Sequence, residues 1–233
     1  MFLIPARRPS RELLDDPNLP QEEMARSLAD IAFINRRWGG SHALARHIGE
    51  RLESDRASRA RILDVGAGSG DVLRRLAREL WLAGHAVTSV AADLQWRHLV
   101  AGRRMAGERF AAVAADAFRL PFSDDAFDWT ISTLVFHHFA PDENVRFLRE
   151  VARVSRHGFA LLDLRRHLFP LIFLKALGTF VLRSRVSLQD GAASVRQAYT
   201  PEEARRIAAR AVPGARVEKV FPYRLLISGG AAP

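Results

Sequence analysis

The sequence predicts an α/β protein whose core is a doubly wound, seven-stranded and mostly parallel sheet. Between residues 61 and 164, short apolar runs alternate with amphipathic stretches in the manner of repeated β-α-β units. Hydrophobic residues make up 48% of the 233 residues, which is enough to bury a sizeable core. A strand pattern, a glycine-rich loop and a helix pattern follow one another directly at residues 61–83, as they do where parallel sheets cradle nucleotide-like ligands.

Residues 1–60 are expected to form a helical cap in front of the core, which covers residues 61–233. A helix is predicted over 21–38, because Met24, Leu28, Ile31 and Ile34 recur on one helical face. A second helix over 41–52 can begin at Ser41, since serine is a strong N-cap. A polar link at 53–60 leads into the first strand.

The core elements follow in order. Strands are predicted over 61–65, 86–92, 111–115, 127–136 and 159–164, because near-continuous apolar runs are typical of parallel strands that are covered on both faces. Helices are predicted over 70–83, 95–105 and 142–154, the last with Asp142 as its N-cap. The capping box at residues 200–203 opens a helix to 211, and two antiparallel strands at 216–221 and 223–228 close the sheet.

The segment 165–199 is predicted to be an apolar helical insertion. Its run 168–182 is apolar apart from Lys175, Gly178 and Thr179, and it is too short to span a bilayer. Three interpretations stay open for this run: a lid over a hydrophobic acceptor, a helix in peripheral contact with a membrane surface, and an ordinary packed helix.

The glycine loop excludes two common ligand types. Gly66, Gly68 and Gly70 stand at alternate positions, so the third glycine of a dinucleotide fingerprint is missing, and no lysine provides a phosphate-binding loop. Asp64 directly precedes the loop; its carboxylate would repel a pyrophosphate and attract an ammonium group. Residues 62–70 resemble motif I of class I S-adenosylmethionine-dependent methyltransferases, whose cofactor carries an ammonium group and no phosphate.

This resemblance covers about residues 61–164 and implies a Rossmann-like methyltransferase fold with S-adenosylmethionine as cofactor. Strands in such a sheet end at one rim, where Asp64, Asp93, Asp116 and His137 should meet. Asp64 and the loop are expected to hold the methionine end, Asp93 to accept hydrogen bonds from the ribose hydroxyls, and Asp116 with the Ala117 N–H to bind adenine, although Asp116 could also be a helix cap. The full cofactor set is Asn35, Asp64, Gly66, Ala67, Gly68, Ser69, Gly70, Asp93, Leu94, Asp116, Ala117 and Thr133.

The adjacent residues His137 and His138 are the candidate catalytic residues. They fall in the segment that resembles the transfer-site lining of the family, and a histidine can remove the proton of an oxygen acceptor. His137 is favoured slightly over His138, and the alternative is that both only pack or orient ligands. No metal site is expected, because adjacent histidines do not easily share one ion. Trp38 is assigned to stacking on a ring, and Arg165 and Arg166 to an anionic or phenolate group of the substrate.

The acceptor is expected to be a hydrophobic small molecule. Residues 14–17, 35–40 and 194–200 resemble bacterial methyltransferases that accompany polyketide synthases, which implies O-methylation of a phenolic hydroxyl in bacterial secondary metabolism. The wider similarity includes quinone-biosynthesis C-methyltransferases, which remain the first alternative. A non-catalytic S-adenosylmethionine-binding partner in a biosynthetic assembly and an RNA methyltransferase are the others. The acceptor atom and the oligomeric state stay open.

The composition disfavours a nucleic-acid partner despite a net charge of +9. Only Lys175 and Lys219 are lysines, and the arginines are spread along the chain without a basic block. The chain has no cysteine, and its N-terminal segment has an apolar start followed by Arg7 and Arg8, the reverse of a signal peptide. A cytoplasmic location is therefore expected.

Overall fold

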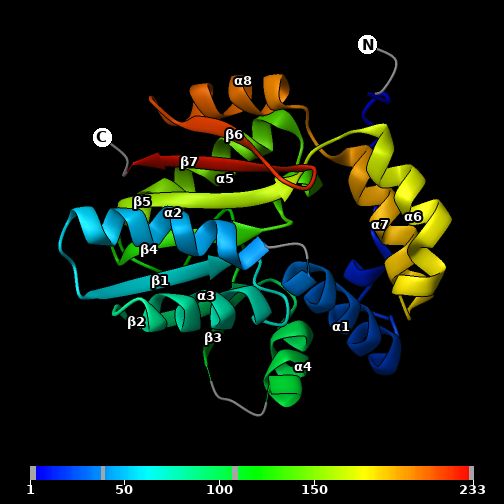
Figure 1. The fold of residues 1–233 in the computed structure, drawn as a ribbon, viewed down its shortest axis with the longest axis horizontal. Coiled ribbons are helices and arrows are strands. Elements are labelled where there is room, and N and C mark those ends of the chain that lie inside the picture. The colour runs from blue at the N-terminus through cyan, green and yellow to red at the C-terminus, as the bar shows by residue number, and fades with distance from the viewer. Residues whose placement is uncertain (1–3, 38–39, 107–109, 231–233) are drawn as a thin grey trace.

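The computed structural model describes residues 4–37, 40–106 and 110–230 and contains one mixed sheet (Figure 1). Its strand order is β3-β2-β1-β4-β5-β7-β6, and β7 runs antiparallel to both of its neighbours. The predicted seven-stranded, mostly parallel α/β fold is therefore confirmed. The strands are β1 (Arg59–Val65), β2 (Ala86–Asp93), β3 (Ala111–Ala114), β4 (Phe127–Thr133), β5 (Ser155–Leu164), β6 (Arg216–Val220) and β7 (Arg224–Gly230).

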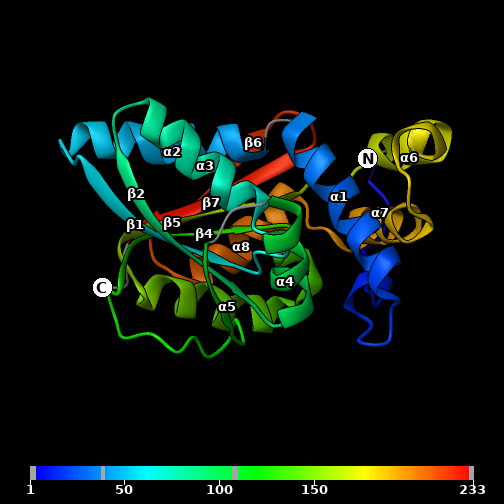
Figure 2. The same ribbon diagram turned by 90° about the horizontal axis from the view of Figure 1, so that it is seen from below.

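Helices cover both faces of this sheet (Figure 2). Strand β1 shows why: Ile62 packs into one hydrophobic cluster, whereas Leu63 and Val65 pack into another, since side chains alternate along a strand. The Ile62 cluster is closed by α2 (Gly40–Ser54) and α3 (Asp71–Leu82), with Leu99 of α4 (Trp96–Ala106). The Leu63 cluster is closed by α5 (Pro141–Arg153) and α8 (Pro201–Ala211).

A third group of helices lies beyond the carboxyl ends of the parallel strands. It comprises η1 (Leu13–Asp15), α1 (Gln21–Arg37), α6 (Leu168–Val181) and α7 (Arg185–Gln197), seen to the right of the sheet in Figure 1. Two buried carboxylates join the N-terminal part of the group to its later part. Asp190 accepts the N–H groups of Leu13 and Leu14 at 2.9 Å each, and Asp30 accepts that of Ser184 at 2.9 Å. The cap is thus assembled from chain segments more than 150 residues apart.

Several element boundaries differ from the predictions. Strand β4 ends at Thr133 instead of 136, because Leu134 has φ +61° and leaves the extended conformation; η2 (Phe136–His138) follows. Strand β5 begins at Ser155 instead of 159, and α7 forms a separate helix that the apolar pattern did not indicate. Asp142 is not the cap of α5: the helix begins at Pro141, and Glu143 accepts the N–H of Ala140 at 2.7 Å.

Helix α6 carries the apolar run of the predicted insertion. Within the described residues, no helix combines the length and the apolar character needed to cross a bilayer. Phe169 and Ile172 of α6 are about half exposed, at 52% and 51%, while Phe173 and Leu174 also border an internal cavity. Peripheral membrane contact stays a prediction.

Candidate active site

A cavity of about 870 Å³ lies at the carboxyl ends of β1, β2 and β4, beneath the helical cap. The glycine loop and the rim acids form one side of it, and apolar side chains of α1 and α6 form much of the other. Its volume falls within the range of ligand pockets in proteins, and its lining combines apolar surface with few polar groups, as such pockets do.

The glycine loop is held rigidly at the wall of this cavity. The N–H groups of Gly66 and Ala67 donate to the carbonyl of Ala92, at 2.8 and 3.0 Å. Gly66 has φ +71°, and a Cβ atom there would lie 2.3 Å from Cγ2 of Val135, so only glycine fits. Ser69 lines the cavity as well, whereas Gly70 is not among the lining residues and packs against Phe110.

Asp64 is buried at the end of β1, with 1% of its surface exposed. It lines the cavity, and its Oδ1 has no hydrogen-bond partner among the described residues. Burial, together with the charges of Asp71 and Asp93, raises the pKa of Asp64 well above its ordinary value. A buried acid that lacks a donor and is repelled by its neighbours is suited to a cationic ligand such as an ammonium group.

The predicted ribose and adenine residues also line the cavity. Asp93 accepts the N–H of Gly68 and of Gln95, both at 2.7 Å, one on each carboxylate oxygen. Each oxygen keeps a lone pair for a ligand hydroxyl. Asp116 accepts the Phe118 N–H at 2.9 Å in a tight turn, which leaves its other oxygen free of this bond and rules out the alternative of a helix cap. Leu94 and Ala117 complete this side of the cavity.

A polar chain at the cavity wall contains one residue that the sequence did not single out. Asn35 donates to Asp71 and accepts from Nη2 of Arg224, both at 3.4 Å. Arg224 is 3% exposed, lines the cavity, and has no hydrogen-bond partner at Nη1. It stands at the start of β7, about 150 residues from the glycine loop, so no local pattern distinguishes it from the many other arginines. A buried, incompletely bonded guanidinium is suited to an anionic ligand group.

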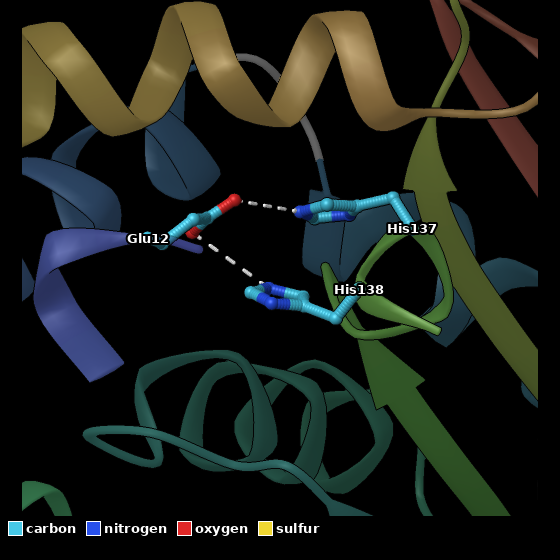
Figure 3. A group of neighbouring side chains, drawn as sticks. All are labelled: Glu12, His137 and His138. Carbon is cyan, nitrogen blue, oxygen red and sulfur yellow. Dashed lines mark hydrogen bonds and ion pairs between the residues drawn. The ribbon is translucent and has the colours of Figure 1, made fainter. Parts of the chain in front are cut away.

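The two histidines lie at the opposite side of the rim, on η2, and both point toward Glu12 (Figure 3). Nε2 of His137 lies 3.3 Å from one carboxylate oxygen of Glu12, and Nε2 of His138 lies 3.7 Å from the other. Nδ1 of His137 is 2.7 Å from Asp163, and Nδ1 of His138 is 3.5 Å from Asp15. Glu12, His137 and His138 all line the cavity; Glu12 was not a candidate in the sequence because only the fold brings it here.

Charge balance separates the two histidines. Burial lowers the pKa of His137, but the charges and hydrogen bonds of Asp163 and Glu12 outweigh burial and raise it to about 10. Burial likewise raises the pKa of Glu12, while His137 and His138 lower it to about 2. The two carboxylates beside His137 therefore hold its pKa above the ordinary value, although the ring is fully buried. The sequence favoured His137 slightly over His138; the structure makes His138 the more accessible of the two, with 25% of its side chain exposed against 2% for His137.

The two arginines assigned to the substrate lie outside the lining of the cavity. Arg166 is 5% exposed, and its donors are used on the carbonyls of Pro5 and Ala198 and on Glu203. Arg165 stacks over Tyr223 at 4.8 Å, and neither arginine lines the cavity. Both arginines therefore contact structural partners outside the cavity lining, and their role toward a substrate stays a prediction. Trp38 lies outside the described residues.

The transfer-site segment holds one predicted cofactor residue. Thr133, the last residue of β4, lines the cavity, and its buried hydroxyl has no partner among the described residues. It is available to a ligand between the glycine loop and the histidines.

The comparison with known proteins agrees with this geometry. A family model described as a methyltransferase domain matches residues 62–158, which run from β1 through the start of β5. This segment is a class I S-adenosylmethionine-dependent methyltransferase domain. S-adenosylmethionine is the cofactor of such domains, and the cavity of this methyltransferase domain fits it. Among the described residues, Oδ1 of Asp64 and Nη1 of Arg224 have no hydrogen-bond partner, and Asp93 offers lone pairs to hydroxyls.

Two curated relatives and one solved structure extend the comparison. The chain is 37% identical over 115 residues to a demethylmenaquinone methyltransferase of Roseiflexus castenholzii, covering 48% of this chain and 46% of that protein. It is 28% identical over 161 residues to a ubiquinone/menaquinone biosynthesis C-methyltransferase of Pseudomonas paraeruginosa, covering 63% and 60%. A methyltransferase structure from Aquifex aeolicus has the same fold, with a TM-score of 0.54 at 19% identity over 79% of this chain and 89% of that one. The chain thus spans about half of its curated relatives.

Proposed function

We propose that this protein transfers a methyl group from S-adenosylmethionine to a hydrophobic aromatic molecule that carries a hydroxyl group. The observation that supports the proposal is that one cavity joins the cofactor rim to His138 and to an apolar wall. Phe169, Phe173 and Leu174 of α6 belong to that wall, and their apolar surface suits a ring or an alkyl chain.

We assign different residues of the cavity to the cofactor and to the acceptor. Asp64 and Arg224 would hold the ammonium and carboxylate groups of the methionine end, and Asp93 the ribose. When bound, the cofactor supplies a methyl carbon on a positively charged sulfur, which already reacts readily with nucleophiles. The chain therefore contributes mainly positioning. At the acceptor side, the Glu12–His138 pair would assist the loss of the hydroxyl proton, so that the acceptor becomes a better nucleophile.

A phenolic oxygen is the first candidate for the methylated atom. A ring carbon of a quinol is the second candidate, and the curated relatives favour it because both are named as methyltransferases of quinone biosynthesis. Loss of a ring hydroxyl proton serves both reactions, because a phenolate carries negative charge on oxygen and on ring carbons. The same His138 geometry therefore supports either outcome.

A product panel tests the proposal and separates these candidates. The protein is incubated with S-adenosylmethionine and a set of alkyl phenols and demethylated quinols, and products are examined by mass spectrometry and NMR. A methyl ether supports the phenolic acceptor, and a carbon-bound methyl supports the quinol. If S-adenosylhomocysteine binds but no member of the panel gains a methyl group, the catalytic proposal fails in favour of a cofactor-binding partner.

Arg224 provides a second, more local test. Arg224→Met is expected to lower the affinity for S-adenosylhomocysteine about 10- to 100-fold, because a buried charge-assisted hydrogen bond contributes about 1.5–3 kcal/mol. Affinity for 5′-methylthioadenosine, which lacks the methionine carboxylate, should stay unchanged. Calorimetric titration of both ligands checks this. An equal loss for both ligands would contradict a carboxylate-binding role, and Arg216→Met on the neighbouring strand β6 is the matched control because Arg216 does not line the cavity.

A further inference from the structure

We propose that Glu12, His137 and His138 bind a divalent transition-metal ion at the acceptor side of the cavity. The three side chains each present one donor atom, and these atoms all lie within 4.8 Å of one another. The proposed ion site does not depend on methyl transfer; only its suggested use on an acceptor rests on the proposed function.

The backbone explains why adjacent histidines can converge here. In an extended strand, successive side chains point to opposite faces, which is why the sequence disfavoured a shared ion. In this chain β4 ends at Thr133, and both histidines belong to the 3-10 turn η2. Their rings lie side by side, with centroids 4.4 Å apart and planes inclined by 32°. Figure 3 shows both rings directed toward Glu12.

The spacing is close to that of a coordination shell. Ligand distances of about 2.0–2.2 Å place neighbouring donors of a tetrahedral site about 3.3–3.6 Å apart. Each histidine is near this distance from one oxygen of the Glu12 carboxylate: Nε2 of His137 lies 3.3 Å from Oε1, and Nε2 of His138 lies 3.7 Å from Oε2. All three donor atoms lie within 4.8 Å of one another, and the His138 side chain, 25% exposed, has the most room to move toward an ion.

Each donor is oriented by a second residue, as metal ligands are. Asp163 lies 2.7 Å from Nδ1 of His137 and Asp15 lies 3.5 Å from Nδ1 of His138, so a carboxylate faces the far nitrogen of each ring. Ser194 and Gln197 of α7 donate to Glu12 at 2.5 and 2.6 Å. Several carboxylates around two imidazoles also make the site favourable for positive charge.

The donor set indicates the class of ion. Two imidazole nitrogens and one carboxylate suit Zn²⁺ and the neighbouring divalent transition metals, whereas Mg²⁺ and Ca²⁺ prefer oxygen ligands only. Three protein ligands leave a coordination position open, as in catalytic zinc sites. Because all three ligands line the cavity, that position faces the acceptor. It would suit the deprotonated hydroxyl of a phenol or catechol.

Zinc titration tests the inference without cofactor or acceptor. The full chain, freed of any affinity tag and treated with a chelator, is titrated with ZnCl₂ by calorimetry and with CoCl₂ by visible absorption. We expect one ion per chain, a visible cobalt band, and zinc-dependent stabilisation against heat. His138→Ala and Glu12→Gln should each weaken zinc binding at least tenfold, and Asp163→Asn about 10- to 100-fold.

The control variant is His42→Ala, which removes an exposed histidine whose Nδ1 pairs with Glu79 at 3.2 Å. It should bind zinc as the unaltered protein does. Absence of both zinc heat and the cobalt band in the unaltered protein overturns the site, as does equal zinc affinity in the His138→Ala and unaltered proteins. Zinc binding without methyl transfer would support the ion site and refute the proposed function. Methyl transfer by a protein that binds no zinc would support the proposed function and refute the ion site.

Discussion

Replacing Asp64 with asparagine is expected to lower the affinity for S-adenosylhomocysteine about 10- to 100-fold at neutral pH. The variant keeps the shape of the side chain but removes the charge that faces the ammonium group, and a hydrogen bond to a charged group contributes about 1.5–3 kcal/mol. The same substitution should raise the thermal stability of the ligand-free protein. Asp64 is buried without a partner at Oδ1, and a neutral amide is desolvated at lower cost than a carboxylate.

The pH dependence follows from the raised pKa of Asp64. In the ligand-free protein, a folded pKa above the unfolded value means that stability falls as pH rises from the unfolded toward the folded pKa. The ammonium group favours the ionised carboxylate, so ligand affinity should increase over the same rise in pH. Binding below the folded pKa should therefore release a proton. The amide of the Asp64→Asn variant carries no such proton, so the variant should lose this dependence.

Calorimetry in buffers of different ionisation enthalpy measures both the affinity and the released proton. Asp124→Asn, an exposed substitution whose side chain pairs with Arg153, is the matched control and should change neither. Affinity for 5′-methylthioadenosine should stay the same in Asp64→Asn because that ligand has no ammonium group. If Asp64→Asn binds S-adenosylhomocysteine as tightly as the unaltered protein across pH, Asp64 does not hold the methionine end.

Replacing His138 with alanine is expected to lower kcat for a hydroxylated acceptor about 10²- to 10⁴-fold, the range of general acid–base catalysis. His138 is the more accessible of the two histidines, and Nε2 of His138 lies 3.7 Å from Glu12 at the cavity wall. The loss is expected whether the imidazole removes the proton directly or holds an ion that acidifies the hydroxyl. Affinity for S-adenosylhomocysteine should change less than about twofold, because the defect is confined to the acceptor side.

Steady-state kinetics with the acceptor found in the product panel measures this effect. His157→Ala, an exposed position on β5 far along the strand from the rim, is the control and should keep full turnover. Full turnover in His138→Ala would remove His138 from the transfer site. A parallel loss of S-adenosylhomocysteine binding would instead indicate that the substitution disturbs the whole cavity.

Local sequence patterns predicted most of the cofactor side. Asp64, the glycine loop and Asp93 each follow a strand whose apolar run is visible in the sequence, and parallel strands place their carboxyl ends at one rim. These residues needed no long-range information, because chain direction and strand order alone bring them together. Gly70 shows the limit of the pattern: the motif includes it, but its place behind the loop depends on the packing of Phe110.

Other charged residues of the cavity could not be predicted in the same way. Glu12 and Arg224 reach the cavity from opposite ends of the chain, and an acid or an arginine at those positions has no periodicity or motif to mark it. The arginines assigned from strand proximity, Arg165 and Arg166, bind structural partners instead. Nothing in the sequence indicated that the adjacent histidines share a site, because neighbouring side chains of a strand point to opposite faces. In the structure Leu134, with φ +61°, follows the end of β4, and the turn η2 brings both rings to the same side.

The sequence by itself determined the sheet, the glycine loop and the acids at the rim, because these depend on residue patterns within single β-α units. Only the tertiary structure decided which charged side chains line the cavity. Asp30 joins α1 to the start of α7, Asp190 joins α7 to η1, and Glu12 directly before η1 lies against the two histidines. The carboxylates on either side of His137 then outweigh the effect of burial and raise the pKa of that ring. The predicted cofactor site thus depends on local sequence, and the proposed acceptor site depends on the assembled cap.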